Sequence, residues 1–317
     1  MAVYVNTNYS ALQGQRYLGN VQNSLTTTYQ RLSSGMRINS AKDDAAGLQI
    51  ADRLTSQING LNQGNRNASD GIALAQTAEA GMDEISSMLQ KIRTLAVQAN
   101  NGTNTNADKQ ALAKEASSLA TEITRIAKQT TFAGKTILNG KQDNSIDPFV
   151  QGGNGAKGDA MSITLQVGSN KGDTISFGLV NLQFSAAAQK AGIAAGEFVD
   201  QAAADKAFVK AANGDTIKVN FTGAGMAANI IEHMDKMIGY VDSQRADLGA
   251  IQNRLESSIR NQSNVAANEA DARSRIRDAD FAEESANLSQ QSIIQQAAAS
   301  MLMQANTRPQ LGLSLLG

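Results

Sequence analysis

The sequence predicts a mainly α-helical protein: a long antiparallel helical rod, coiled-coil-like and built from both chain ends, with a central β-hairpin region and a small α/β insertion. Apolar residues recur in alternating steps of three and four over long stretches of both halves, which is typical of packed helices. The chain has only two prolines, Pro148 and Pro309, so these stretches are free to be helical. In the middle of the chain, between the two helical halves, apolar residues recur at every second position and glycines mark turns. This pattern indicates strands.

The composition argues against several classes of function. The chain has no cysteine and one histidine, His233, so thiolate catalysis and the two-histidine HExxH zinc site are excluded. A formal net charge of −1 gives no electrostatic reason for nucleic-acid binding. No apolar run approaches the length that crosses a bilayer, and Met1–Thr7 does not resemble a Sec-type signal peptide. We expect no cofactor, no metal, no nucleic acid and no membrane insertion.

The first predicted helix spans Ala11–Leu32 and ends at Gly35, since glycine adopts the left-handed C-cap conformation without steric cost. The residues of its apolar seam are spaced alternately three and four apart, and the small polar Thr28 occupies one of these positions. The large apolar members of that seam are Leu18, Val21, Leu25 and Leu32.

A polar turn should begin the second helix. Ser40 and Asp43 resemble a capping box, which places Asp43 and Asp44 in the first helical turn. We interpret the acidic pair as helix capping and not as a metal site, because no further ligand cluster accompanies it.

The next two predicted helices span Asp44–Asn100 and Ala107–Gln129. Gly60–Gly64 and Gly71 are candidate interruptions of the first, and Thr105 with Asp108 can cap the second. The second helix has heptad positions at Leu112, Ala116, Leu119, Ile123 and Ile126.

The centre of the chain is predicted to contain strands. The alternating apolar residues are Met161, Ile163, Leu165 and Val167, followed by Ile175 and Phe177. The tripeptide Gly134–Thr136 resembles the end of a P-loop, but Gln129 stands where that motif requires glycine, so we assign no nucleotide site. Gly178–Gly225 is weakly patterned, apart from a short strand near Val219, and we interpret it as a small outlying insertion.

The C-terminal part returns to helical spacing. Ala227–Ala272 carries the longest heptad run, with His233 expected to be a structural residue. The arginines after it are balanced by acidic neighbours and indicate a solvated mixed-charge face. A last helix is predicted at Phe281–Ala305, with seam residues Leu288, Ile294, Ala298 and Met301.

The two terminal helices have few large apolar residues and are rich in Gln, Asn and Ser, so alone they would be marginal or disordered. Such ends are expected if they fold only when many copies share a core, which describes a polymer subunit. We divide the chain into 1–43 and 273–317 (N- and C-terminal parts of an inner terminal-helix domain), 44–177 and 227–272 (the two parts of a rod domain), and 178–226 (a small outer insertion).

Several motifs together resemble the bacterial flagellins. The stretch Gln30–Ala51 resembles their N-terminal signature, departing at Met36, usually lysine, and Gln49, often alanine. Further flagellin-like segments are Leu95–Asn100, Phe132–Lys135, Leu165–Asn170 and Ser274–Gln304. The resemblance covers about Met1–Phe177 and Ala227–Gly317 and leaves out the expected insertion.

The resemblance implies a secreted subunit of the flagellar filament, the helical propeller of swimming bacteria. It implies export of the unfolded chain through the flagellar type III apparatus, with an export chaperone, a filament cap protein and a hook–filament junction protein as partners. Paired terminal helices would form the core of the homopolymer, and the β-hairpin would take part in switching filament shape. The insertion would project outward, so we expect removal of residues 179–224 to leave the helical seams intact.

The resemblance also implies recognition by animal innate immune receptors for flagellin. The family's recognised face matches Gln90, Lys91, Leu95 and Glu115 here. Lys91 replaces the usual arginine and lacks its planar bidentate fork, so we expect weaker recognition. Gln30–Ala51 also resembles the peptide that plants sense, except at Met36.

Three alternatives remain at this point. A hook–filament junction protein shares the terminal helices but lacks the full Gln30–Ala51 match. Some flagellins carry a metalloprotease in the insertion, but one histidine and a short insertion argue against it here. A coiled-coil adhesin would form a parallel bundle with one long helix per chain, and the central β segment argues against that.

Overall fold

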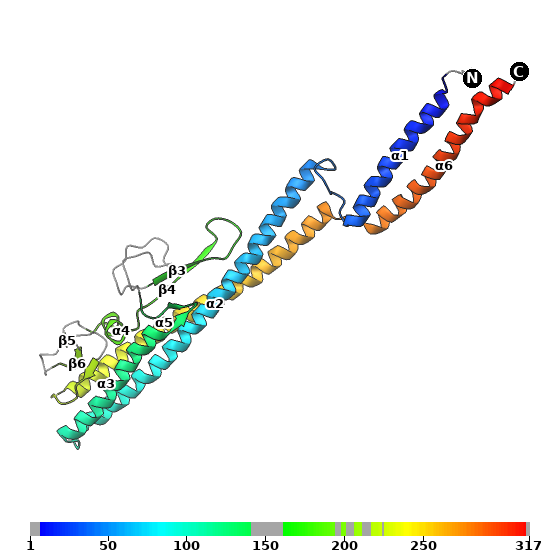
Figure 1. The fold of residues 1–317 in the computed structure, drawn as a ribbon. Coiled ribbons are helices and arrows are strands. Elements are labelled where there is room, and N and C mark those ends of the chain that lie inside the picture. Colours follow the sequence, from blue (N-terminus) through cyan, green and yellow to red (C-terminus); the bar gives the residue numbers. More distant parts are fainter. Residues whose placement is uncertain are drawn as a thin grey trace. The chain divides into compact units, whose positions relative to one another are not determined.

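The structure, a computed structural model, describes residues 7–140, 161–193, 198–200, 206–210, 217–223 and 225–314. Its helices are α1 (Tyr9–Ser34), α2 (Ala45–Ala99), α3 (Asn106–Gln129), α4 (Phe184–Lys190), α5 (Met226–Arg277) and α6 (Phe281–Ser314). Its strands are β1 (Thr131–Phe132), β2 (Lys135–Thr136), β3 (Met161–Gln166), β4 (Thr174–Leu179), β5 (Phe198–Asp200), β6 (Phe208–Lys210) and β7 (Ile217–Val219). The predicted fold class is confirmed: long helices come from both chain ends and small strand pairs lie in the middle (Figure 1).

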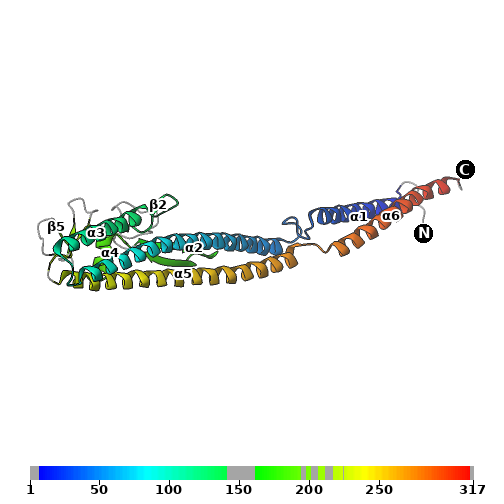
Figure 2. The same ribbon diagram turned by 90° about the horizontal axis from the view of Figure 1, so that it is seen from below.

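Contacts divide the chain into two compact units. The terminal unit comprises residues 1–59 and 265–317, and the central unit comprises residues 60–264. In the central unit α2, α3 and α5 run alongside one another (Figure 1 and Figure 2). The five-part division expected from the sequence remains a prediction about which parts of the chain serve which role.

The connection between α1 and α2 begins as predicted and then differs. Gly35 has φ 68° and caps α1 in the left-handed conformation. The carboxylate of Asp43 accepts hydrogen bonds from the backbone N–H groups of Asn39 and Ser40, which forms a turn before the helix. Asp44 is the N-cap, because its Oδ1 accepts from the backbone N–H groups of Ala46 and Gly47 at 3.1 and 2.9 Å. The expectation that Ser40 caps the helix, with Asp43 and Asp44 in its first turn, is therefore wrong: both aspartates precede the helix, which begins at Ala45 with Asp44 as its N-cap.

Helix α2 is continuous through every glycine that the sequence offered as an interruption. A Cβ atom at Gly60 would lie 2.8 Å from Ser169 Cβ, one at Gly64 would lie 1.9 Å from the Val167 carbonyl oxygen, and one at Gly71 would lie 2.2 Å from Leu165 Cδ1. These glycines admit the β3–β4 hairpin to the helix surface. They leave room for the hairpin backbone at Gly64 and for hairpin side chains at Gly60 and Gly71, and none of them ends the helix.

Helix α3 begins at the predicted capping box. Thr105 Oγ1 accepts from the N–H of Asp108, and the Asp108 carboxylate accepts from the N–H of Thr105 at 2.9 Å. The buried stripe of the helix is shifted from the predicted heptad, since Leu112, Leu119 and Ile126 are only partly buried against the core. The fully buried face of α3 consists of Ala113, Ala116, Ala120, Ile123, Thr124 and Ala127.

The P-loop-like tripeptide lies in a tight hairpin. Strands β1 and β2 pair antiparallel, with Phe132 opposite Lys135, and the two residues between them have positive φ, 50° at Ala133 and 80° at Gly134. Positive φ at both central residues is the signature of a type I′ turn. The geometry of this turn, and not a P-loop, therefore explains the tripeptide Gly134–Thr136.

The predicted alternation in the centre is confirmed. Strands β3 and β4 pair antiparallel from Met161–Leu179 to Gln166–Thr174. Met161, Ile163 and Phe177 are buried, and the pattern continues to the buried Val167 beyond the strand. In the third sheet β5 is parallel to β6, and β6 is antiparallel to β7.

The described residues between 178 and 226 pack against the helices of the central unit. Their described apolar side chains belong to the same buried cluster as the helices of the central unit. The N–H of Leu182 donates to the Leu138 carbonyl at 2.9 Å, and the N–H of Val219 donates to Ser117 Oγ at 2.9 Å. The fully buried members include Leu179, Leu182, Phe184, Phe208 and Phe221. These contacts argue against the expectation that removing 179–224 leaves the core seams intact, and that expectation remains to be tested.

Helix α5 follows its predicted heptad in most positions. Met234, Val241, Leu248 and Leu255 recur at heptad spacing and are buried. Ile230 and Met237 are also fully buried, whereas Ile231 and Ile238, which lie beside them, are only partly buried. The polar heptad positions contact α2: Arg245 pairs with Asp83 at 3.1 Å and Gln252 donates to Glu79 at 2.9 Å. His233 is half-buried, with its ring centre 5.9 Å from that of Phe208.

Candidate assembly interface on the paired terminal helices

The first and last helices pack against each other within one chain. Asn8 Nδ2 donates to the Ala305 carbonyl at 2.8 Å, while Thr28 Oγ1 donates to Gln291 Oε1 at 3.1 Å. Because the partner number falls as the α1 number rises, the helices are antiparallel. The adhesin alternative, a parallel bundle with one long helix per chain, is therefore wrong. The sequence had suggested ends that are marginal alone, and in the structure the two ends are paired with each other.

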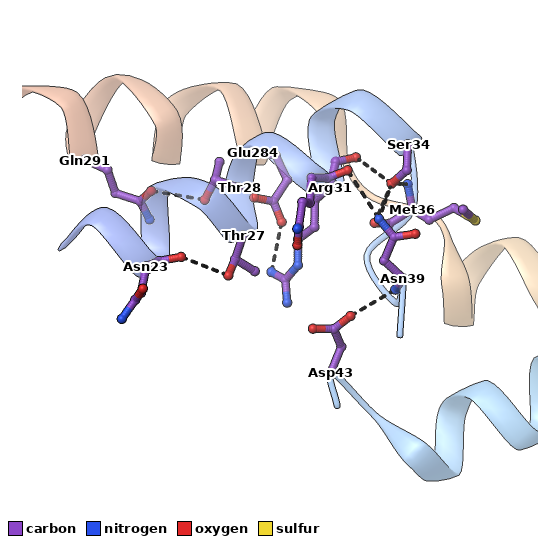
Figure 3. A network of polar contacts seen from close by, with 11 residues as sticks. Asn23, Thr27, Thr28, Arg31, Ser34, Met36, Asn39, Asp43, Glu284 and Gln291 are labelled. Carbon is purple, nitrogen blue, oxygen red and sulfur yellow. Dashed lines mark hydrogen bonds and ion pairs between the residues drawn. The ribbon is translucent and has the colours of Figure 1, made fainter. Parts of the chain in front are cut away.

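Polar side chains occupy part of the seam between α1 and α6, close to the linkers (Figure 3). Arg31 Nη1 contacts Glu284 Oε1 at 3.1 Å, and the Glu284 side chain is only 9% exposed. Thr28, the polar step of the predicted stripe, is 5% exposed. Buried polar pairs add little net stability but fix which positions face each other, so these contacts set the register of the pair.

Two linkers lie beside this seam, one connecting α1 to α2 and the other connecting α5 to α6. Backbone hydrogen bonds join them. The Gly35 carbonyl accepts from the N–H of Ala279 at 3.0 Å, and the Arg277 carbonyl accepts from the N–H groups of Arg37 and Ile38. Figure 3 shows Asn39 between Ser34 and Asp43, where its side chain donates to Ser34 Oγ at 3.0 Å. The N–H donors of Ser40 and Asn39 hold the pKa of the exposed Asp43 carboxyl below its usual range.

The structure places seven of the eight predicted assembly residues on the seam. Leu18, Val21, Leu25, Leu32, Leu288 and Ile294 are half-buried there, and Ala298 is buried. Met301 differs, because 60% of it is exposed. The residues chosen from the 3-4 spacing therefore bind the two helices of one chain together.

A second set of large apolar residues on these helices is exposed; of these, the 3-4 spacing had identified only Met301. On α1 they are Tyr9, Leu12, Tyr17 and Tyr29, each more than half exposed. On α6 they are Phe281, Ile293, Met301 and Met303, exposed by 60% or more. A search for one apolar stripe finds the face that packs within the chain and passes over the others. Large apolar side chains that stay exposed on paired helices are candidates for contacts with other molecules.

A groove of about 440 Å³ opens between α1 and α6 near the chain ends. Gly14, Ala298 and Ala305 supply its small residues, and Tyr17 and Met301 supply large ones. A Cβ atom at Gly14 would lie 3.3 Å from Leu302 Cδ1, so the helices are closely packed below it. An apolar side chain of another molecule would fit this groove.

The predicted receptor-facing residues lie together in the central unit. Gln90, Lys91 and Leu95 from α2 and Glu115 from α3 line one shallow hollow of about 450 Å³. Lys91 and Glu115 are exposed, and Leu95 is half-buried against the core. The structure thus brings four residues from two helices onto one accessible patch, here called the α2–α3 patch.

Within the described part of the chain, no group of three or more His, Cys, Asp or Glu side chains is arranged to hold a metal ion. Among the same residues, no helix is long and apolar enough to cross a membrane.

Comparisons with known proteins agree across the whole chain. The bacterial flagellin N-terminal helical region matches residues 5–143, and the bacterial flagellin C-terminal helical region matches residues 231–316. The chain is 37% identical to Flagellin A of Vibrio cholerae and 35% identical to Polar flagellin C of Vibrio parahaemolyticus, in alignments that cover 100% of each chain.

A solved structure is similar in fold. It is described as a flagellar hook-associated protein from Vibrio parahaemolyticus, with a TM-score of 0.53 and 15% sequence identity. The similarity covers 74% of this chain and 100% of that chain.

Proposed function

This chain belongs to the bacterial flagellins, and we propose that its copies polymerise through the exposed apolar surface of the α1–α6 pair. As a member of this family, the chain is a structural subunit of the extracellular flagellar filament and not an enzyme. Full-length identity to flagellins favours the filament subunit over the junction protein, since the hook-associated structure is similar in fold alone.

The observation that carries the proposal is the set of large apolar side chains that stay exposed on the paired helices. Leu12 and Tyr17 on α1 and Ile293 and Met303 on α6 are more than half exposed although the helices are already paired. Burying a large apolar side chain contributes about 1.5–3 kcal/mol, so covering these residues with neighbouring copies would drive assembly. The seam between α1 and α6 is partly polar and rich in small residues, and it sets how the two helices pack together.

Ile293→Asp is the sharpest test, because Ile293 is 65% exposed in the single chain. The free subunit should keep its helicity, since the new carboxylate stays in water. In a polymer the charge would be buried without a partner, and we expect the critical concentration for polymerisation to rise by at least about 100-fold. Seeded polymerisation followed by sedimentation measures this.

Two neighbouring variants sharpen the result. Ile293→Leu keeps the apolar surface and should pellet like the wild type. Ile294→Asp places the charge in the half-buried seam and should lower both monomer helicity and assembly. Normal pelleting of Ile293→Asp would remove the exposed face of α6 from the assembly surface.

We also infer the route to the filament. The seam between α1 and α6 buries few large side chains, so the pair unfolds at low free-energy cost, as export of an unfolded chain through the type III apparatus requires. An export chaperone would cover the exposed apolar faces before export, the filament cap protein would aid refolding at the tip, and the hook–filament junction protein would present the first matching surface.

A second role is favoured by the α2–α3 patch. We propose that Gln90, Lys91, Leu95 and Glu115 form the face seen by innate immune flagellin receptors, because the four lie together and reach solvent on one side of the central unit. The ammonium group of Lys91 offers a single charged donor, whereas an arginine offers a planar fork.

Lys91→Arg should increase receptor activation, by an expected factor of about 3 to 10, because a bidentate contact contributes roughly an additional 1 kcal/mol. Titration of monomeric protein on receptor-reporter cells measures the half-maximal dose. Lys114→Arg, an exposed position on α3 outside the patch, is the matched control and should change nothing. Equal doses for wild type and Lys91→Arg would contradict the assignment.

A further inference from the structure

Methionine sulfur atoms are distributed unequally between the interior and the surface. Met82, Met161, Met234 and Met237 are at most 1% exposed, and Met36, Met88 and Met226 are half-buried. Among the described methionines, only Met301 and Met303 are exposed, by 60% and 66%. A dissolved oxidant therefore reaches these two thioethers first.

Both sulfur atoms lie on the surface assigned to assembly, on different sides of α6. Met301 lines the groove between α1 and α6 together with Tyr17. Two residues along a helix correspond to a rotation of about 200°, so Met303 points to the side of α6 away from that groove. A subunit surrounded by neighbours would place the two thioethers in two different contacts.

We propose that Met301 and Met303 form an oxidation site that controls whether a free subunit can polymerise; the inference rests on the assembly surface proposed above. Methionine fills irregular apolar gaps because it is flexible and polarisable. Its sulfoxide is polar and stiffer, and burying it without a hydrogen-bond donor is unfavourable. Polymerised copies would protect both sulfur atoms by covering them.

The reaction needs no catalytic residue. A lone pair on the thioether sulfur attacks one oxygen of hydrogen peroxide, the S–O bond forms and the O–O bond breaks. The departing hydroxide takes the remaining proton and leaves as water, so sulfur loses two electrons and the peroxide gains them. Methionine sulfoxide reductases reverse this product, which makes the modification a switch and not only damage.

The two sites should differ in strength. Gln13 and Gln304 line the groove with Met301, so their amide N–H groups can donate hydrogen bonds to a sulfoxide formed there. Met303 lies on the other side of α6 from these donors. We expect its oxidation to weaken polymerisation more than that of Met301.

The experiment uses full-length monomer treated with limiting hydrogen peroxide, peptide mass mapping and seeded sedimentation. Met301 and Met303 should oxidise before Met82 and Met234, and the critical concentration should rise at least about tenfold. Treatment with methionine sulfoxide reductases should restore pelleting, and circular dichroism should show unchanged helicity throughout. Filaments given the same dose should retain both residues unoxidised.

Variants separate this site from other damage. The double variant Met301→Leu/Met303→Leu should be insensitive to peroxide, with the same critical concentration before and after treatment. Met88→Leu, a change at a half-buried methionine of the central unit, should leave the protein sensitive. Normal pelleting of wild type that carries both sulfoxides would overturn the proposal, as would equal sensitivity of the double variant.

The two proposals fail in distinguishable ways. If untreated Ile293→Asp pellets normally, the assembly surface itself is wrong. If Ile293→Asp fails to pellet while the doubly oxidised wild type pellets normally, the assembly surface stands and only the oxidation site is rejected.

Discussion

A chain that lacks residues 179–224 should lose the cooperative unfolding transition of its central unit. Leu179, Leu182, Phe184, Phe208 and Phe221 are each fully buried in the core that α2, α3 and α5 share. At about 1.5–3 kcal/mol for each large apolar side chain, these five together are comparable to the whole net stability of a domain, about 5–15 kcal/mol. Calorimetry and limited proteolysis of the shortened chain would detect the loss. A sharp transition at the wild-type temperature would contradict the expectation.

Because a long deletion can unfold a protein for several reasons, a point substitution isolates the cause. Phe184→Ala should lower the free energy of unfolding of the central unit by about 3–5 kcal/mol, since Phe184 is fully buried and packs edge-on against Phe208. Phe281→Ala is the matched control, because Phe281 is 64% exposed in the terminal unit. The control should leave the stability of the central unit unchanged.

Gly64→Ala should separate the β3–β4 hairpin from α2. The added Cβ would lie 1.9 Å from the Val167 carbonyl oxygen and 2.6 Å from the carbonyl carbon, and a backbone cannot yield as a flexible side chain can. Asn67 Nδ2 also ties the hairpin to the helix through the Gln166 carbonyl at 2.9 Å. Overpacking costs about 1–3 kcal/mol or more, which exceeds the roughly 1 kcal/mol that alanine gains over glycine in a helix. Urea denaturation should show a net loss of about 2 kcal/mol.

The control for this substitution lies in the other long helix. Gly239 lies inside α5, and a Cβ built there meets nothing within 4 Å. Gly239→Ala should therefore stabilise the protein by about 0.5–1 kcal/mol. If Gly64→Ala stabilised by the same amount, the hairpin would not rest on α2 at Gly64.

Local signals in the sequence predicted local structure well. The capping box of Thr105 and Asp108 was found because both partners lie within one turn, and Gly35 was found because its left-handed conformation is a property of the residue itself. The glycines of α2 could not be interpreted in this way. Whether Gly64 breaks a helix or admits another backbone depends on a hairpin about 100 residues away, and no local pattern contains that information.

The limits of periodicity explain the other differences. Phe184 and Phe208 lie in short segments without a repeat, so their burial depends on long-range packing that spacing does not encode. On the terminal helices, the 3-4 spacing found Leu25 and Ile294 because they face the partner helix of the same chain. The exposed Leu12 and Ile293 follow no seam within the chain. The surface proposed for contacts between copies therefore consists of apolar residues that remain exposed after those facing the partner helix are set aside.

The two linkers of the terminal unit have a mechanical consequence. A single peptide joint swivels, because rotation about its φ and ψ bonds meets little resistance. Here two linker segments connect α1 to α2 and α5 to α6. Their backbones are hydrogen-bonded to each other: the Gly35 carbonyl accepts from Ala279 N–H, and the Arg277 carbonyl accepts from Arg37 N–H at 2.7 Å. A double-stranded joint cannot be twisted without winding one strand about the other and breaking these bonds. The two connections are therefore held side by side by backbone hydrogen bonds, and rotation of one about the other would break those bonds.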